Sequence, residues 1–440
     1  MGRIVHDYGY YVPGSYSVNA AHANTSVKYD SMRKRVLTVD KVIFYIKADL
    51  QSGFRQFGTH PSDWRFQVYC NGLSEHYIDL ACPFGKTNST LEFCPPVKLF
   101  AISAAVRWKK STRAVLPALS SYVDDVYGGI PGCNSFELSM DLRNYICTMG
   151  KQLTFVFNEK PHKTPLPARQ QVILGSLYDS TSKLLRVAPA KVEKYVSRID
   201  DALRDISMPA HKIMSLHGNL NFAATAAPFG RPFLSSLSGL VAGRTKNDVV
   251  TLNDTAAMCL RIWKKLLLRN CGISYDFILG RLPRTTFNIF VDASEEWGIG
   301  GLCGNLYFKF PWSQLPDFVH EFISRKELLS ALIALHCFHQ VIEDKLTYLY
   351  TDNTNVRDWL VMGRSKKMKG LRYLALWELA KFKHRCKVSP RWLPSNHNGS
   401  ADKLSRGTTP EWLQRDGTRV SCDLRRLAHD LNHVEEAWDV

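Results

Sequence analysis

Short apolar segments alternate with longer helical patterns over the first 185 residues. The short segments have the β-branched and aromatic content of strands, and the longer ones repeat their apolar residues at helical spacing. The predicted strands are residues 42–49, 66–70, 76–81, 120–127, 153–157 and 171–174, and the predicted helices are 91–109 and 135–150. Residues 158–169 carry three prolines and are expected to form an extended connection. This part of the chain is therefore predicted to mix α and β structure.

The second part of the chain shows two different patterns. Residues 189–206 predict an amphipathic helix with Pro189 in its first turn, 226–245 contain Gly, Pro and Ser without a clear period, and 252–270 again predict a helix. From residue 287 the pattern restarts: a strand ends at Asp292, a glycine-rich hairpin partner follows, and helices then alternate with strands. This order indicates a mixed sheet covered by helices.

Composition and charge narrow the class of protein. The 440 residues are 45% hydrophobic and 22% charged, a globular composition long enough for two or three domains. A net charge of +17 favours a polyanionic partner such as nucleic acid over the alternative of a generally basic protein. No apolar run reaches 18 residues and no secretory pattern opens the chain, so neither a membrane span nor secretion is expected. The 11 scattered cysteines predict reduced thiols in a cytosolic or nuclear protein and argue against a cysteine zinc site.

Adjacent carboxylates at Asp124 and Asp125 suggest a metal site. They interrupt SSYVDDVYGG (residues 120–129), whose other residues are typical of a strand, and only a tight turn lets two neighbouring side chains approach one small volume. Asp49 offers a third carboxylate, because it ends an apolar strand. Three carboxylates on neighbouring strand ends can hold two Mg²⁺ ions roughly 4 Å apart. The pattern therefore predicts two-metal phosphoryl transfer.

These residues resemble a known family. Tyr-x-Asp-Asp, about 75 residues after a strand-terminal Asp, looks like the palm of a reverse transcriptase. The resemblance extends to residues 3–7 with 17–19, 49–56, 83–89, and 158–160 with 173–175. It implies an α+β multidomain chain, in which a right-hand polymerase has its fingers and palm in 1–188, its thumb in 189–245 and a connection in 246–286.

The resemblance also implies roles for single residues. The implied metal ligands are Asp49, Asp124 and Asp125, and the implied substrate-binding residues are Arg3, Phe54, Phe84, Gly85 and Lys160. Arg3 would contact the incoming triphosphate, Phe84 and Gly85 would line the nucleotide pocket, and Lys160 would meet the leaving pyrophosphate. Phe54 would lie under the sugar, where its ring excludes a 2′-hydroxyl and selects dNTPs over rNTPs. Each residue alone has a plainer interpretation, such as a helix cap for Asp49 or a core side chain for Phe54.

Four further acids follow in the second part of the chain. They are Asp292, Glu327, Asp352 and Asp402. Asp292 and Asp352 each end a predicted strand. Four acids at one rim of a sheet would repel one another unless cations bind. Their order resembles the Asp–Glu–Asp–Asp set of the ribonuclease H fold. The resemblance implies an α/β ribonuclease H-like domain over 287–410 that hydrolyses RNA in an RNA–DNA hybrid with two more Mg²⁺ ions, and 411–440 then form a C-terminal tail.

Basic residues flank the predicted sites. Two clusters, residues 364–372 and 381–387, lie near Trp377 and Trp392, and the predicted thumb helix carries Lys191, Lys194 and Arg198. A surface that grips nucleic-acid phosphates is one interpretation, and a solvated helix face is the alternative.

Together these patterns predict an RNA-directed DNA polymerase with ribonuclease H activity that uses Mg²⁺, with Mn²⁺ as an alternative. Its expected partners are an RNA template, a DNA primer, an RNA–DNA hybrid and dNTPs, and no membrane. The segments 183–192, 214–224, 325–335 and 396–407 look closest to tyrosine-recombinase retrotransposons of the DIRS and Ngaro kind, which would add a recombinase encoded by the same element. Two alternatives stay open: a catalytically inactive or domesticated nucleic-acid-binding protein that retains the fold, and an RNA-directed RNA polymerase, against which Phe54 and the second set of acids argue.

Overall fold

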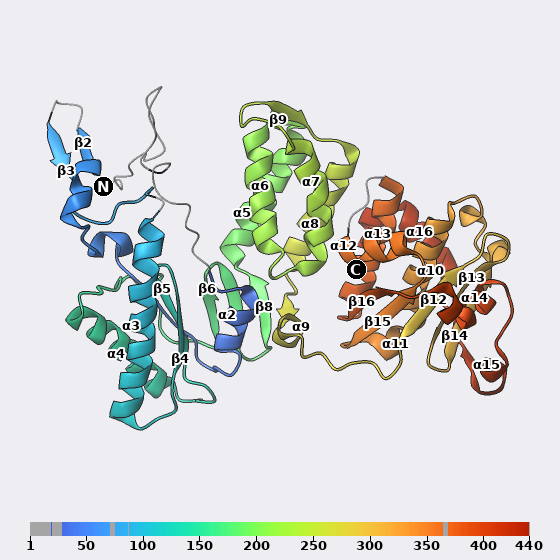
Figure 1. Cartoon of the computed structure of the whole chain (residues 1–440), viewed down its shortest axis with the longest axis horizontal. Coiled ribbons are helices and arrows are strands. Elements are labelled where there is room, and N and C mark those ends of the chain that lie inside the picture. Colours follow the sequence, from blue (N-terminus) through green and yellow to red (C-terminus); the bar gives the residue numbers. More distant parts are fainter. Residues whose placement is uncertain (1–18, 20–28, 71–74, 87, 364–367, 440) are drawn as a thin grey trace. The chain divides into compact units, whose positions relative to one another are not determined.

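The computed structural model describes residues 19, 29–70, 75–86, 88–363 and 368–439. The chain divides into two compact units, Met1–Leu185 and Arg186–Val440, and both contain helices and sheets (Figure 1). The architecture is therefore mixed α+β with several sheets, as the hydrophobic pattern predicts.

A three-stranded antiparallel sheet carries the first set of acids. Its strands, in spatial order, are β1 (Ile46–Asp49), β5 (Asp125–Gly129) and β4 (Ala118–Tyr122). Helices α3 (Ser89–Thr112) and α4 (Phe136–Gln152) share one hydrophobic core with this sheet. The buried residues of α3 recur at the spacing of a single helix face and include Phe93, Val97, Phe100, Ala104 and Trp108. This core fixes β1 and β5, and with them the acids at their adjoining ends.

The rest of the first unit consists of short elements. They are α2 (Met32–Val39), the hairpin of β2 (Val68–Cys70) and β3 (His76–Ile78), and the hairpin of β6 (Gln170–Ile173) and β7 (Ser176–Asp179), after which β8 (Leu184–Val187) begins. The predicted strand at 153–157 is wrong. The N–H of Phe155 donates to the carbonyl of Gly150 at 2.8 Å, so the chain is still closing the end of α4, and Thr154 has a φ of 65°. Only Phe157 forms an isolated bridge, to Leu50.

The second unit begins with helices that pack on one another. They are α5 (Pro189–Arg204), α6 (Ala210–Ala223), α7 (Leu234–Val241) and α8 (Asp254–Arg269), seen together in Figure 1. The strands β9 (Ser207–Pro209) and β10 (Val249–Thr251) pair with each other, and β11 (Ile273–Ser274) and α9 (Tyr275–Leu279) follow. The amphipathic pattern of α5 holds, because its buried residues Tyr195, Ile199 and Ala202 lie on one face.

A six-stranded mixed sheet carries the second set of acids. Its strands, in spatial order, are β16 (Lys387–Trp392), β15 (Leu346–Thr351), β12 (Ile289–Ala293), β13 (Gly298–Cys303), β14 (Leu306–Pro311) and β17 (Thr418–Arg419). The three consecutive strands β12, β13 and β14 are antiparallel neighbours. In contrast, β15 runs parallel to β12 and to β16, and β17 runs parallel to β14. The predicted mixed sheet is therefore present.

Helices pack against this sheet. They are α10 (Ile323–Cys337), α11 (His339–Ile342), α12 (Thr354–Met362), α13 (Met368–Lys383) and α14 (Gly399–Ser405). Helix α10 is buried at every residue from Lys326 to Leu335, because it packs against both β12 and α13. The region expected as a C-terminal tail, residues 411–440, contains α15 (Glu411–Asp416), β17, α16 (Leu424–Asn432) and α17 (Val434–Ala437). No helix in the described part of the chain has the length and hydropathy needed to cross a bilayer.

Candidate functional site

Asp49, Asp124 and Asp125, here called the trio, come together where β1 meets the β4–β5 hairpin. In the antiparallel register Asp49 lies directly opposite Asp125, so both side chains point to the same face of the sheet. Asp124 lies in the hairpin turn after Val123, whose φ is 53°. The backbone N–H of Leu50 donates to the carbonyl of Asp124 at 2.8 Å, which ties the turn to the end of β1. The structure thus brings Asp49 together with an adjacent pair of acids that lies far from it in the sequence.

Gly53 sets how closely the chain passes over this turn. A Cβ added at Gly53 would lie 2.8 Å from the Phe93 ring and 3.1 Å from the Cβ of Asp124. A larger residue would therefore push the segment after β1 away from Asp124. The requirement is local and steric, and it explains why a glycine follows Asp49 at this distance.

The trio carries poorly balanced negative charge. Burial raises the pKa of Asp125 to about 6; the ammonium of Lys47 opposes this shift, and Asp124 and Asp49 add to it. Burial likewise raises the pKa of Asp124, and the charge of Asp49 contributes to that rise. The ionised form of a carboxylate in such a position is stabilised when a cation binds beside it.

Two lysines near the trio were not singled out in the sequence. Lys47 lies 3.3 Å from Asp125 Oδ1, and Lys163 lies 3.4 Å from Asp49 Oδ1. Lys160, the expected lysine, is exposed, and its backbone N–H bonds the side chain of Asn158 at 3.1 Å. The carbonyl of Lys160 accepts the N–H groups of Lys163 and Thr164, and this turn directs Lys163 toward Asp49. The only signal in the sequence was a second lysine three residues further along the same proline-rich segment.

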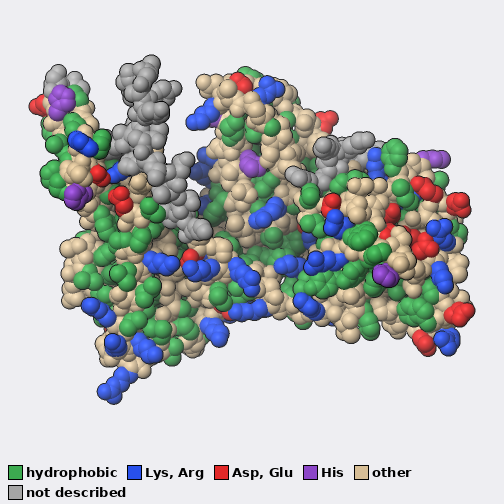
Figure 2. Space-filling model, viewed as in Figure 1, with side chains coloured by type: hydrophobic (Ala, Val, Ile, Leu, Met, Phe, Trp, Pro, Cys, Tyr) green, Lys and Arg blue, Asp and Glu red, His purple; other side chains and the backbone are tan. Residues whose placement is uncertain are grey.

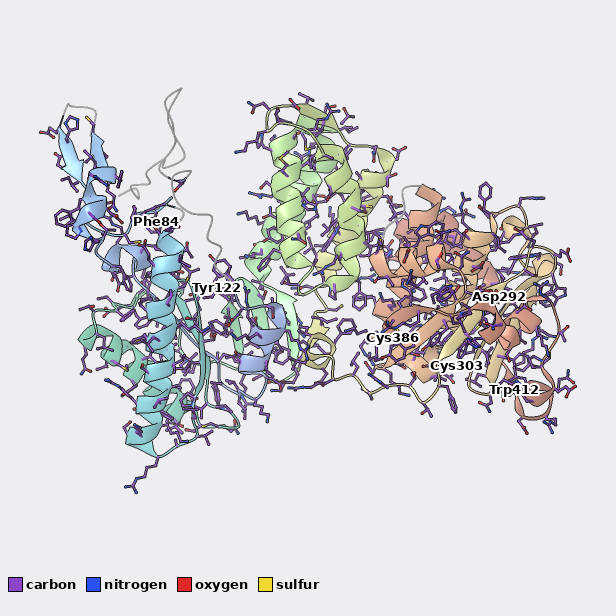
Figure 3. All side chains as sticks on the ribbon, viewed as in Figure 1. Phe84, Tyr122, Asp292, Cys303, Cys386 and Trp412 are labelled. Atoms are coloured by element: carbon purple, nitrogen blue, oxygen red, sulfur yellow. The ribbon has the colours of Figure 1, made fainter. Side chains whose placement is uncertain are left out.

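The predicted nucleotide-pocket residues form an aromatic cluster beside the trio. The Phe54 ring lies 5.3 Å from Phe84 and 4.6 Å from Phe93, measured between centroids. Gly85 is exposed, has a φ of 96°, and its carbonyl accepts the Asn19 side-chain amide at 2.9 Å. Figure 3 shows Phe84 near the start of α3. Arg3 lies outside the described residues.

Asp292, Glu327, Asp352 and Asp402, here called the quartet, come together at one rim of the six-stranded sheet. Asp292 lies near the end of β12 and Asp352 follows β15, the parallel neighbour of β12 (Asp292 is labelled in Figure 3). Glu327 reaches the same rim from α10, where it accepts the Asn353 amide at 3.1 Å and the Thr351 hydroxyl at 3.3 Å. Asp402 lies on α14 and binds Arg406 at 2.8 Å.

The quartet is also poorly balanced in charge. Burial raises the pKa of Glu327 to about 7, and the charges of Asp352 and Asp292 add to the rise. Burial raises the pKa of Asp292 to about 6, with contributions from Asp352 and Asp402, against a hydrogen bond from Ser405 that lowers it. All four acids therefore interact electrostatically, although two of them lie on helices and two at strand ends.

Ser405 and Gly300 position α14 over the quartet. Ser405 was not predicted, and Gly300 was expected only as part of the glycine-rich hairpin after the strand that ends at Asp292. The Ser405 hydroxyl donates to Asp292 Oδ2 at 2.6 Å. A Cβ at Gly300 would lie 2.5 Å from the Cβ of Leu404 and from the N of Ser405, so only glycine lets α14 pack this close to β13. Asn398 also anchors this segment, since its amide donates to the carbonyl of Val291 at 3.0 Å.

Both sets of acids offer only oxygen donors, the ligand type that hard divalent cations prefer. Among the residues that the structure describes, no three acids of either set bring one carboxylate oxygen each within 4.8 Å of one another. Two Mg²⁺ ions about 4 Å apart, each about 2 Å from its ligands, spread those ligands over roughly 8 Å. Carboxylates with raised pKa values and oxygen-only donors suit Mg²⁺ or Mn²⁺. The type of the donors therefore suits the expected ions, and their spacing exceeds that of the ligands of a single ion.

The expected phosphate-gripping residues divide between surface and core. Lys and Arg side chains are spread over both units in the face that Figure 2 shows. Trp392 is exposed, but Trp377 is buried, and Lys381 pairs with the buried Glu378 at 2.8 Å, so the expected surface around Trp377 and Lys381 is wrong. The cluster at 364–372 lies partly outside the described residues. On α5, the Lys191 ammonium lies 3.6 Å from the centre of the Phe222 ring, and burial lowers its pKa.

Comparison with known proteins finds similarity in fold alone. No protein-family model matches the chain, and no curated protein matches it. Three solved structures of foamy viral protease–reverse transcriptase are similar, each at 14% identity. The form named dRH, in complex with double-stranded DNA, has a TM-score of 0.47 and is matched over 89% of this chain and 62% of its own. The complex with an RNA/DNA hybrid has a TM-score of 0.43 over 86% and 47%, and a further complex with double-stranded DNA has 0.41 over 84% and 72%. This chain thus spans less than two thirds of the first two.

Proposed function

We propose that this chain is an RNA-directed DNA polymerase and ribonuclease H. The trio would extend a DNA primer on an RNA template, and the quartet would hydrolyse the RNA strand of the resulting hybrid. One observation carries the proposal: at one rim of each of two separate sheets, buried and half-buried acids from distant parts of the sequence come together without enough positive charge to balance them. Burying a carboxylate costs free energy, so two such clusters call for bound cations.

Bound Mg²⁺ would lower the pKa of an attacking hydroxyl or water and stabilise the leaving oxygen. Neighbouring residues of the chain hold the carboxylates that would bind these ions in fixed positions. In the trio, Asp49 is fixed by its own backbone, because its N–H donates to the Thr164 hydroxyl at 3.3 Å and its carbonyl accepts the Asn158 N–H at 2.7 Å. In the quartet, Asn353 and Thr351 orient Glu327, and Ser405 orients Asp292. Lys163, rather than Lys160, is the lysine that we assign to the leaving pyrophosphate.

Phe54 supports the choice of dNTP over rNTP. Its ring is held between Phe84 and Phe93, so it cannot swing away from a sugar without disturbing both. We expect Phe54→Val to admit rNTPs, measured as the ratio of kcat/KM for the two sugars. Unchanged sugar selection would remove this role and would reopen the RNA-directed RNA polymerase alternative.

Primer extension on an RNA template with Mg²⁺ tests the polymerase. Wild type should incorporate dNTPs and Asp124→Asn should not, while Glu92→Gln, which removes an exposed acid of the same unit, should match wild type. If wild type binds the primer–template tightly and makes no product, the chain is the non-catalytic nucleic-acid-binding protein of the alternative.

Cleavage of an RNA–DNA hybrid tests the second activity separately. Asp292→Asn should stop cleavage and leave primer extension intact, and Asp317→Asn, an exposed acid in the same unit, should change neither. Loss of both activities in Asp292→Asn would show that the two sites are not independent. Membership of the DIRS and Ngaro group, with a recombinase as partner, rests on the sequence phrases and would be tested by co-purification with that recombinase.

A further inference from the structure

A cluster of two histidines and a glutamate lies on the C-terminal helices, away from both sets of acids in the sequence. The donor atoms of His429, His433 and Glu436 all lie within 4.8 Å of one another, and all three side chains are exposed. Among the residues that the structure describes, no other group of three His, Cys, Asp or Glu side chains is this close. We propose that this group, here called the HHE cluster, binds one divalent transition ion of the Zn²⁺ type. The inference does not depend on the proposed enzymatic function.

Helical spacing brings the two histidines together. His433 follows His429 by four residues, and its backbone N–H donates to the carbonyl of His429 at 2.9 Å, so both rings lie on one side of a helical turn. The rings are stacked with centroids 4.5 Å apart and an angle of 23° between them. Glu436 follows by three residues, and its Oε1 lies 3.4 Å from His433 Nδ1.

These distances suit a tetrahedral ion. Ligand atoms about 2.0–2.1 Å from Zn²⁺ lie roughly 3.4 Å from one another. The His433–Glu436 pair already has that separation, and the exposed side chain of His429 closes the remaining difference by rotating about its own bonds. Three protein ligands leave the fourth position to water.

The ligand types separate this cluster from the trio and the quartet. Imidazole nitrogens select Zn²⁺ and its transition-metal neighbours, whereas the trio and the quartet offer only oxygen and suit Mg²⁺. The cysteine count of the sequence argued against a cysteine zinc site, and the HHE cluster contains no cysteine. Excess Mg²⁺ should therefore occupy the acids and leave the HHE cluster free.

The HHE cluster lies at the bend between α16 and α17, close in sequence to residues that contact other helices of the second unit. His433 has φ −120° and ψ 51°, which bends the chain between α16 and α17. Just beyond it Trp438 is fully buried, with its ring 5.9 Å from Phe233 and 6.1 Å from Phe382. Arg261 of α8 binds Glu435 at 2.7 Å. An ion across the bend would therefore hold α17 in the position from which Trp438 and Glu435 make these contacts.

Calorimetric titration of the full chain with Zn²⁺, in excess Mg²⁺, tests the proposal. We expect one site in wild type, weakened at least tenfold in His433→Gln and in His429→Gln. His76→Gln, which removes an exposed histidine in the first unit, is the control and should bind as wild type does. Equal Zn²⁺ affinity in wild type and in the His429→Gln/His433→Gln double variant would overturn the proposal.

Hydrogen exchange gives a second measurement that does not depend on the count of sites. Zn²⁺ should slow amide exchange in residues 424–439 of wild type and not in the double variant. Since the three side chains are exposed, the variants should keep the far-ultraviolet circular dichroism of wild type. Zn²⁺ that binds without changing exchange in this segment would contradict the assignment to the HHE cluster.

Discussion

Acidification should raise the Mg²⁺ requirement of hybrid cleavage, because protons and Mg²⁺ compete for the same oxygens of the quartet. The pKa values are about 7 for Glu327 and about 6 for Asp292 without metal, and both carboxylates must be ionised to act as ligands. At pH 8 both are almost fully ionised. At pH 6 about one-tenth of Glu327 and about half of Asp292 are ionised.

The loss of ionised Glu327 and the loss of ionised Asp292 multiply in their effect on Mg²⁺ binding. Between pH 8 and pH 6 the Mg²⁺ concentration that gives half-maximal cleavage should rise about 20-fold. At pH 7 metal binding should release about 0.6 proton from the quartet, most of it from Glu327. Ionisation of Asp292 alone would account for only about 0.1 proton at that pH.

Two assays check these numbers. Hybrid cleavage is measured against Mg²⁺ concentration at each pH, and the midpoint is compared rather than the maximal rate, because the rate also reports the attacking water. Proton release is measured by calorimetry in buffers of different ionisation enthalpy, with Glu327→Gln expected to abolish most of it and Asp317→Asn to leave it unchanged. A Mg²⁺ midpoint that is constant within twofold between pH 6 and pH 8 would refute the reasoning.

Three further predictions concern single residues. Glu327→Gln should stabilise the metal-free protein at pH 8 by up to about 3 kcal/mol in chemical denaturation and should have little effect at pH 4. The reason is that folding raises the pKa of Glu327 from 4.5 to about 7. Its contribution to stability is therefore present below pH 4.5 and is lost as the pH rises through 7. Gly300→Val should displace α14 from β13 and lower hybrid cleavage more than tenfold while sparing primer extension; equal cleavage by this variant and wild type would contradict the role of the close approach. Lys163→Met should lower primer extension at least tenfold, whereas Lys160→Met should have a smaller effect, and the reverse order would restore the assignment made from the sequence.

The sequence predicted best where strand patterns end in an acid. A strand pattern ending at Asp49 and a hairpin turn at Asp124 were both visible in the order of apolar and polar residues, and the register of β1 with β5 then brings them together. The mixed sheet after residue 287 was visible for the same reason. In each case the determining interactions are local or follow from strand alternation.

Predictions from the sequence were wrong where they had to say which of several neighbouring side chains faces a site or the surface. Whether Lys160 or Lys163 faces Asp49 depends on a turn closed by backbone hydrogen bonds, which no periodicity reveals. Trp377 stands in a basic stretch that suggested a surface, yet packing of α13 buries it. The apolar run at 153–157 has the composition of a strand, but its first residues form the turn that ends α4, and its residues lack a partner strand beyond one bridge.

The turn from Asn158 to Thr164 reaches Asp49 at its backbone N–H, its carbonyl and its carboxylate. Arg143 of α4 in turn clamps that segment through the carbonyls of Thr164 and Pro165, at 2.7 Å and 2.9 Å. The turn is therefore held on one side by Asp49 and on the other by α4. Substitutions at Arg143 should therefore move the Asp49 carboxylate as much as substitutions in the turn itself, although Arg143 does not contact Asp49 directly.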